Sequence, residues 1–476
     1  MRLPPLLCWA LIGPLCASAC TGADPRPGTP ARHLLLVTVA GLRAGHTSAW
    51  QYQRPTTWTE IDGGLRRDGR ALALDDLAAE GVMFSKAFTP SGATEASLAT
   101  LFTGRPPLET GVLAPGDASP ESPSGAGLEA GLETGHATLA GRLTAEGFAT
   151  AGFVSGESAA GDVARSGFEV FEVGRDDRDA LGRALDWVNL HDFGNGKEVF
   201  LWVHLAGPTF PFEPTLESGT VERGGPVDFA KLFIDESYAG SADGSASFRA
   251  AAGALSPADR DRVTDLYDGE VAQANHLLQL FLDFYRYAGA PSEVWQRTLF
   301  VLAGTAGLEL FEEDTPGRWG RTERLTDSVL HVPLLVRHPD SLTGRRIFSD
   351  VVELQDVMPT FLDWFRLGAA DTARGRSLLP VTDHEGRDFE ERASFGCRGA
   401  QGRVEALTVR GNRFRLIWTP GDEEPYRLFD QTTDPLALDD LASAQPETVE
   451  RLKAELEAWL QERAATSSVD LSAFGH

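Results

Sequence analysis

The sequence has little cysteine and a shortage of positive charge, and each shortage excludes a class of protein. Only 4 of the 476 residues are cysteine, and three of those lie within the first twenty positions. Cys397 therefore has no intrachain partner once that segment is removed, which excludes a disulfide framework. Lysine and arginine total 43 against 69 aspartates and glutamates, for a formal net charge of −26. Such an acidic surface repels nucleic acid, so no nucleic-acid partner is expected.

Long hydrophobic runs are also scarce, and after residue 19 no stretch has the length and apolar character of a membrane span. Residues 1–19 do contain a short apolar segment, which follows Arg2, is broken by prolines and ends in Ala17-Ser18-Ala19. This arrangement is typical of an export signal peptide.

Two processing routes predict the same cleavage before Cys20. Ala17-Ser18-Ala19 fits an ordinary small-residue cleavage site, which would give a soluble periplasmic or secreted protein. With Cys20, the same residues resemble a bacterial lipobox in which Cys20 carries the lipid, although Ala17 replaces the usual leucine. Residues 20–32 are rich in proline, glycine and threonine, as in a tether. We favour the second route, which predicts an exported lipoprotein anchored in the membrane of the bacterial cell envelope.

The rest of the chain is ordinary for a globular protein, with 42% hydrophobic and 24% charged residues. Residues 34–39 form a near-continuous apolar run of strand length, as in a strand buried on both faces. Strands are also expected at 149–154, 199–204, 299–303 and 332–337, with helical stretches between them. This pattern predicts a large α/β domain with a mixed sheet over residues 33–392.

The last hundred residues have a different pattern. Alternating strands over 404–418 are joined by a hairpin signal, and a helix is expected over 446–463. Residues 393–476 are therefore predicted to form a small C-terminal α+β domain.

The segment 84–105 changes from strand to helix. Its strand-like start meets turn residues at 89–92, and apolar residues then recur with helical spacing from Leu98. Thr94 stands where a helix N-cap is expected. A helix N-terminus that points out of a sheet can bind an anion, whereas for an isolated strand–turn–helix a plain cap is the simpler interpretation.

This segment resembles the nucleophile segment of the sulfatase family, in the alkaline phosphatase superfamily, whose pattern is Cys/Ser-x-Pro-Ser-Arg-x-x-x-Leu-Thr-Gly. Matching its end to Phe102-Thr103-Gly104 places Thr94 at the nucleophile, Ser97 at the serine and Leu98 at the arginine. Further landmarks follow in the family's order over about residues 33–463, including Tyr267-Asp-Gly-Glu. The resemblance implies an alkaline-phosphatase-like three-layer sandwich for the large domain.

The resemblance also implies a divalent cation, usually calcium, held by two carboxylates after the first strand and an Asp-His pair after a later one. Here Ala40 and Gly41 occupy the first two positions, and Thr305 and Ala306 occupy the second two. Hard cations need oxygen ligands, which alanine and glycine side chains lack. We therefore expect no metal cofactor. If the family's backbone frame is intact, aspartates restored at 40, 41 and 305 should create cation affinity.

Other expected substrate contacts differ as well. The family's Asp-Pro-His after the strand 199–204 becomes Gly207-Pro-Thr209, and its lysine before Val332-Pro falls at Arg321 or Thr322. His204 is interpreted as a core histidine. The strand ends should bring together a small neutral pocket, with Thr94 as a vestigial nucleophile and Thr209, Thr305 and Ser97 as remnant binding residues.

Two functions follow from these substitutions. The first is a catalytically inactive, sulfatase-like lipoprotein with a binding or scaffolding role, for which the sequence indicates no particular protein or small-molecule partner. The second is an active sulfuric or phosphoric ester hydrolase that uses Thr94 as nucleophile and a relocated metal site. The missing ligands favour the first.

Overall fold

The computed structural model describes residues 33–58, 73–113, 138–156, 162–191, 193, 197–217, 227–251, 253–286, 292–312, 319–320, 322–337, 346–370, 372–382 and 391–475. The predicted signal peptide, the tether with Cys20, and Arg321 lie outside these residues, so the interpretations of those segments remain predictions.

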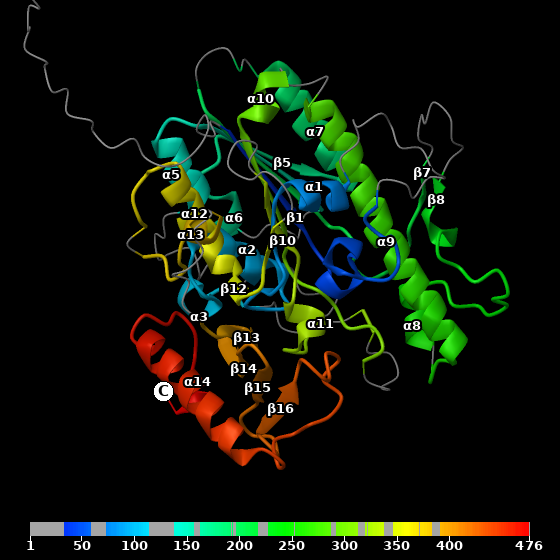
Figure 1. The fold of residues 1–476 in the computed structure, drawn as a ribbon, viewed down its shortest axis with the longest axis vertical. Helices are drawn as coiled ribbons and strands as arrows, with labels where there is room; N and C mark the ends of the chain where they lie inside the picture. Colours follow the sequence, from blue (N-terminus) through cyan, green and yellow to red (C-terminus); the bar gives the residue numbers. More distant parts are fainter. Residues whose placement is uncertain are drawn as a thin grey trace, which may run out of the picture.

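A mixed eight-stranded sheet forms the centre of the large domain (Figure 1). Its order is β11-β2-β10-β9-β1-β6-β4-β5. The strands are β1 (His33–Val39), β2 (Val82–Phe84), β4 (Ala149–Ser155), β5 (Val170–Gly174), β6 (Val199–Leu205), β9 (Thr298–Gly304), β10 (Leu334–Arg337) and β11 (Arg346–Phe348). β1 pairs in parallel with β6 and β9, whereas β10 runs antiparallel to both of its neighbours. The predicted mixed sheet is confirmed, with β1 in its interior.

Helices cover both faces of this sheet (Figure 1). α2 (Thr94–Thr103), α5 (Leu139–Ala145) and α12 (Val357–Trp364) contribute to a core with Leu34 and Leu36 of β1. α1 (Leu74–Glu80), α7 (Asp177–Leu190), α9 (Pro257–Phe284) and α10 (Ser292–Gln296) contribute to a second core with Leu35 and Val37. Because successive strand side chains point to opposite faces, an unbroken apolar strand is needed between two such cores. The predicted three-layer sandwich is therefore confirmed.

Shorter elements connect these layers. They are α3 (Pro107–Thr110), α6 (Asp162–Arg165), α8 (Ala246–Ala251), α11 (Asp327–Leu330), α13 (Leu379–Thr382), and the two-residue strands β3 (Ala87–Phe88), β7 (Leu216–Glu217), β8 (Val227–Asp228) and β12 (Val352–Glu353). Within the part of the chain that is described, no helix combines the length and the apolar character needed to cross a membrane.

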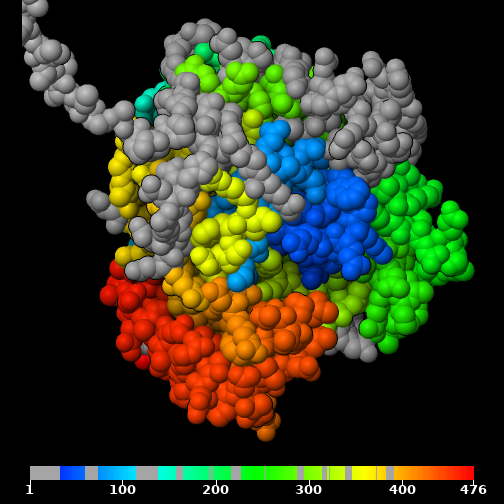
Figure 2. All heavy atoms as spheres, in the orientation of Figure 1, coloured from blue at the N-terminus to red at the C-terminus, as the bar shows by residue number. Residues whose placement is uncertain are grey.

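The C-terminal unit is a four-stranded antiparallel sheet with one long helix. The strands β13 (Ser394–Ala400), β14 (Arg403–Arg410), β15 (Phe414–Trp418) and β16 (Tyr426–Asp430) pair in sequence order. α14 (Pro446–Ala464) covers this sheet with Leu452, Leu456 and Leu460, which are all buried. The predicted small α+β unit is confirmed, and Figure 2 shows its orange and red surface continuous with that of the large domain.

Candidate functional site

The residues predicted to form a pocket follow three neighbouring parallel strands. Ala40 and Gly41 follow β1, Thr209 lies beyond the end of β6, and Thr305 and Ala306 directly follow β9. Because β6, β1 and β9 are adjacent and parallel, their carboxyl ends lie at the same edge of the sheet. Open α/β sheets bind ligands at this edge.

Thr94 lies beside Thr305 at this edge, with their hydroxyl oxygens 3.3 Å apart. The Thr305 amide donates to the Val39 carbonyl at 3.0 Å, which ties the end of β9 to the end of β1. The expected N-cap by Thr94 is wrong, because Ala93 precedes the first helical residue and no side chain caps α2. The turn before the helix is instead held by Ser91, whose hydroxyl accepts from the Ala93 amide at 3.2 Å.

Ser97 lies in α2, is fully buried and contacts the same turn. Its hydroxyl lies 2.5 Å from the Thr89 hydroxyl and donates to the Ser91 carbonyl at 3.1 Å. These contacts stabilise the turn that precedes Thr94. The Ser97 hydroxyl, predicted as a remnant binding group, is thus bonded within the protein.

The exits of β1 and β6 pack backbone against backbone through two glycines. Gly41 has φ +69°, and a Cβ there would lie 2.1 Å from the Pro208 carbonyl oxygen. Gly207 has φ +55°, and a Cβ there would lie 2.7 Å from the Ala40 carbonyl oxygen. Both backbones adopt the left-handed region that favours glycine. An aspartate at 41 therefore fits only if the exit of β6 shifts, because the neighbouring backbone fills the space that its side chain needs. The cation affinity expected from aspartates at 40, 41 and 305 stays a prediction.

Thr209 lies on the outer side of this contact. Its Cγ2 would be 3.0 Å from a Cβ at Gly41, and Thr209 is exposed to solvent. The structure thus brings Thr209, Thr305 and Thr94 to one edge of the sheet, with Thr305 buried and Thr209 facing outward.

A family model described as Sulfatase matches residues 34–367. The chain belongs to the sulfatase family. A second model, described as N-sulphoglucosamine sulphohydrolase, C-terminal, matches residues 318–465. The family resemblance read from the sequence is confirmed.

Individual relatives of this sulfatase-family chain are distant. It is 32% identical over 130 residues to arylsulfatase K of Gallus gallus, a match that covers 26% of this chain and 24% of the relative. The phosphonate monoester hydrolase of Agrobacterium radiobacter has the same fold, with a TM-score of 0.64 at 18% identity over 92% of this chain and 96% of the other. The structure of BT4656 with its substrate D-glucosamine-2-N,6-O-disulfate has a TM-score of 0.65 at 15% identity over 92% and 98%. The curated relative is matched over only about a quarter of its length.

The Tyr267 side chain is hydrogen-bonded to the backbone on both sides of Leu42, just after β1. Its hydroxyl donates to the Gly41 carbonyl at 2.6 Å and accepts from the Arg43 amide at 3.1 Å. Tyr267 is fully buried, and burial raises the pKa of its hydroxyl, which stays protonated at neutral pH. Sequence comparison identified this tyrosine only as a landmark, since its partners are backbone atoms more than two hundred residues away.

The exit of β6 is held by Asp177, at the start of α7. Its carboxylate accepts from the Ala206 amide at 2.7 Å and the Gly207 amide at 3.1 Å. Burial raises the pKa of this carboxyl group. The only signal in the sequence was an acidic pair in the first helical turn, which ordinarily indicates capping.

His46, in the segment that follows β1, belongs to a hydrogen-bond network around Asp268. The buried Asp268 carboxylate accepts from His46 Nδ1, the Tyr52 hydroxyl and Arg54 Nη1, each at 2.7 Å. Burial lowers the pKa of His46. The imidazole is therefore neutral at neutral pH, and it serves as a donor to Asp268.

His204 is a core histidine, as interpreted from the sequence. It is fully buried in β6, and its Nδ1 lies 2.8 Å from the Thr38 hydroxyl. Burial lowers the pKa of the ring to about 3.

The residues at the family's metal position do not fit a divalent cation. Positions 40, 41, 305 and 306 together offer one side-chain oxygen, that of the Thr305 hydroxyl. The Thr94 hydroxyl lies beside it. Calcium takes about six to eight oxygen ligands, usually with carboxylates among them. Across the described ranges, no group of three or more histidine, cysteine, aspartate or glutamate side chains is arranged to hold a metal ion.

Proposed function

We propose that this sulfatase-family chain is a pseudoenzyme with a binding or scaffolding role. The observation that supports the proposal is the close approach of Gly41 to the Pro208 carbonyl and of Gly207 to the Ala40 carbonyl. Each glycine occupies a position where the resemblance implies an acidic residue. If the cation site had been lost only because acidic side chains were replaced, the space for those side chains would remain at positions 41 and 207. Here the Pro208 and Ala40 carbonyls fill that space, so the backbone itself is adapted to the absence of a ligand.

The chemistry of Thr94 supports the same proposal. Esterases of this superfamily use a metal ion to lower the pKa of the nucleophile and to accept charge on the leaving oxygen. Among the described residues, the Thr94 hydroxyl has the Thr305 hydroxyl as its side-chain hydrogen-bond partner, and a threonine hydroxyl is not a base. Glu95 follows Thr94 in the first turn of α2 and would repel an anionic ester when ionised.

The alternative is an ester hydrolase with Thr94 as nucleophile and a relocated cation site. Sulfatase-family homologues are sulfate ester hydrolases, and Thr94 keeps the nucleophile's place at the start of α2. The alternative requires carboxylates that converge near Thr94 on binding a cation.

One experiment separates the two functions. The purified protein is analysed for stoichiometric calcium, magnesium and zinc, and then screened against aryl sulfate, phosphate monoester and phosphonate monoester substrates with each metal added. We expect no stoichiometric metal and no turnover above that of the Thr94→Ala variant. Turnover that the wild type shows and Thr94→Ala loses would establish the hydrolase instead.

We also propose that the protein is exported and anchored to the bacterial cell envelope through lipid on Cys20. Members of the sulfatase family are typically exported or lysosomal, which agrees with an N-terminal export signal. The alternative is cleavage without lipidation, which would give a soluble periplasmic or secreted protein.

A further inference from the structure

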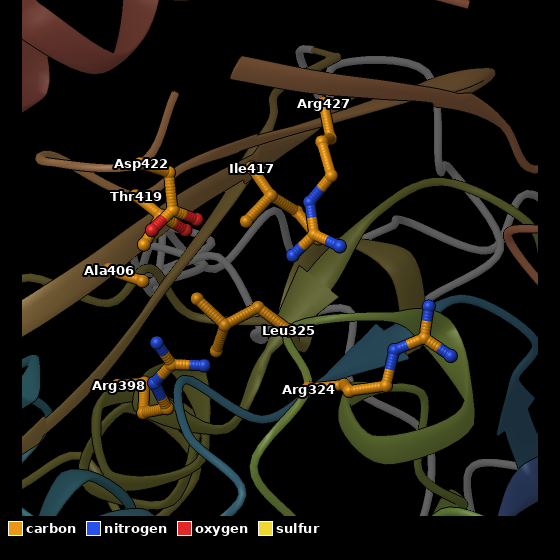
Figure 3. A pocket seen from close by; sticks show the side chains of 8 residues that line it. All are labelled: Arg324, Leu325, Arg398, Ala406, Ile417, Thr419, Asp422 and Arg427. Carbon is orange, nitrogen blue, oxygen red and sulfur yellow. The ribbon is translucent and has the colours of Figure 1, made fainter. Parts of the chain in front are cut away.

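A cavity of about 180 Å³ lies where the C-terminal sheet meets the segment that precedes α11. It is lined by Arg324, Leu325, Arg398, Ala406, Ile417, Thr419, Asp422 and Arg427 (Figure 3). These residues come from the large domain, from β13, β14, β15 and β16, and from the turn after β15. None of them belongs to the threonine site at the ends of β1, β6 and β9.

The cavity is cationic in a strongly acidic protein. Three guanidinium groups, those of Arg324, Arg398 and Arg427, line it together with the single carboxylate of Asp422. The chain as a whole carries a formal charge of −26. Like charges repel one another, so arginines gathered around one cavity are favourable only when anions offset them.

Among the described residues, no anionic group pairs with Arg427 and offsets its charge. Its half-buried guanidinium makes no hydrogen bond and no ion pair with them, and Asp422 is not within ion-pair distance. Figure 3 shows its side chain extending from β16 toward Leu325.

Arg398 is also only weakly engaged. Its Nε lies 3.5 Å from the Glu405 carboxylate, and its Nη1 donates to the Glu323 carbonyl at 3.4 Å. Both contacts are at the long limit for a hydrogen bond. Figure 3 shows its guanidinium below Leu325, on the other side of that residue from Arg427.

The remaining wall is apolar and well packed. Leu325, Ala406 and Ile417 are between 1% and 4% exposed, and they belong to one hydrophobic cluster. Planar guanidinium groups bind the paired oxygens of carboxylate, sulfate and phosphate groups, and an apolar wall lowers the local dielectric constant and strengthens that attraction.

We propose that this cavity binds a small ligand through an oxyanion group, held by Arg398 and Arg427 against the wall of Leu325 and Ile417. The shared chemistry is a carboxylate, sulfate or phosphate group, and inorganic phosphate, inorganic sulfate and citrate are the probes that distinguish these sources. The site does not depend on whether Thr94 is catalytic.

The test is isothermal titration calorimetry of the full-length protein with each probe at constant ionic strength. We expect saturable binding of at least one probe. Arg427→Gln should weaken it by about tenfold or more, since it removes charged hydrogen bonds. Asp422→Asn should tighten it about two- to fivefold, because a repulsive carboxylate is lost.

Arg451→Gln is the matched control. Arg451 is an exposed arginine of α14 that pairs with Glu455 at 2.9 Å, and its replacement removes the same charge away from the cavity. Circular dichroism confirms that each variant is folded. The absence of saturable binding in the wild type, or equal weakening by Arg427→Gln and Arg451→Gln, would overturn the proposal. The proposal would also be overturned if the Asp422→Asn variant bound the probe as weakly as the wild type or more weakly.

Discussion

Arg415 of β15 donates to the Asp327 carboxylate of α11 from Nη2 at 2.6 Å and from Nε at 3.0 Å. Arg410 of β14 pairs with the other oxygen of Asp327 at 3.0 Å. Burial alone would raise the pKa of Asp327, but Arg410 and Arg415 outweigh it and hold that pKa well below its usual range. This buried cluster joins the C-terminal sheet to the large domain.

Replacing Asp327 with Asn should destabilise the protein by about 3–5 kcal/mol, because two buried arginines lose their counter-charge. The free energy of unfolding in urea measures the loss. The exposed residue Asp186 provides the control, and Asp186→Asn should change that free energy by less than about 0.5 kcal/mol.

The effect of Asp327→Asn should depend on pH in one direction. A carboxyl group with a lowered folded-state pKa contributes stability above its unfolded value, here 3.8, and loses it as the pH falls through the folded value. The difference between wild type and variant should therefore be full at pH 6 and shrink below about pH 4. A stability difference between wild type and Asp327→Asn that stays constant from pH 6 to below about pH 4 would contradict the ion pairs of Asp327 with Arg410 and Arg415.

Glu270 of α9 should make the protein less stable in alkaline solution. Burial raises the pKa of Glu270 to about 8, although its carboxylate accepts from the Glu213 amide at 2.8 Å. A raised folded-state pKa means that stability falls as the pH increases from 4.5 through about 8. Glu270→Gln should therefore raise the free energy of unfolding at pH 8.5 by roughly 1 kcal/mol or more. Melting temperatures of both proteins at pH 5 and pH 8.5 provide the measurement, and equal shifts at both would refute the prediction.

Gly41→Ala should be strongly destabilising, by about 2–4 kcal/mol, since it combines a left-handed backbone with a steric clash against the Pro208 carbonyl. Gly45→Ala is the matched control, because a Cβ at Gly45 meets nothing within 4 Å. Thermal denaturation compares the two variants. Equal stability of both would show that the exit of β6 moves freely away from Gly41.

Cys20→Ser should release the protein from the membrane fraction, because lipid would no longer be attached to the first mature residue. Fractionation of cells that express each form, followed by immunoblotting, measures the change. A Cys20→Ser protein that stays in the membrane fraction would place the anchor elsewhere.

The amino-acid sequence by itself determined the family, the mixed sheet and the C-terminal unit. Continuous apolar runs such as 34–39 form strands only when both faces are covered, and the alternation over 404–418 predicts the antiparallel strands β14 and β15, although the structure covers both faces of their sheet. The resemblance also aligned Ala40, Gly41, Thr305 and Ala306 with the ligand positions that it implies. These features are local patterns, so they can be recognised before any distant contact is known.

Only the tertiary structure decided how the chain packs around the ends of β1, β6 and β9. Three features each join segments far apart in the chain: the close approach of Gly41 to the Pro208 carbonyl, the Tyr267 hydroxyl on the Gly41 carbonyl, and the cavity beside Arg427. A single sequence contains no signal for the left-handed backbone at Gly41 or for the carbonyl that faces it. Such contacts depend on how whole strands and helices pack, and this packing is set by burial over the entire core rather than by the residues that meet.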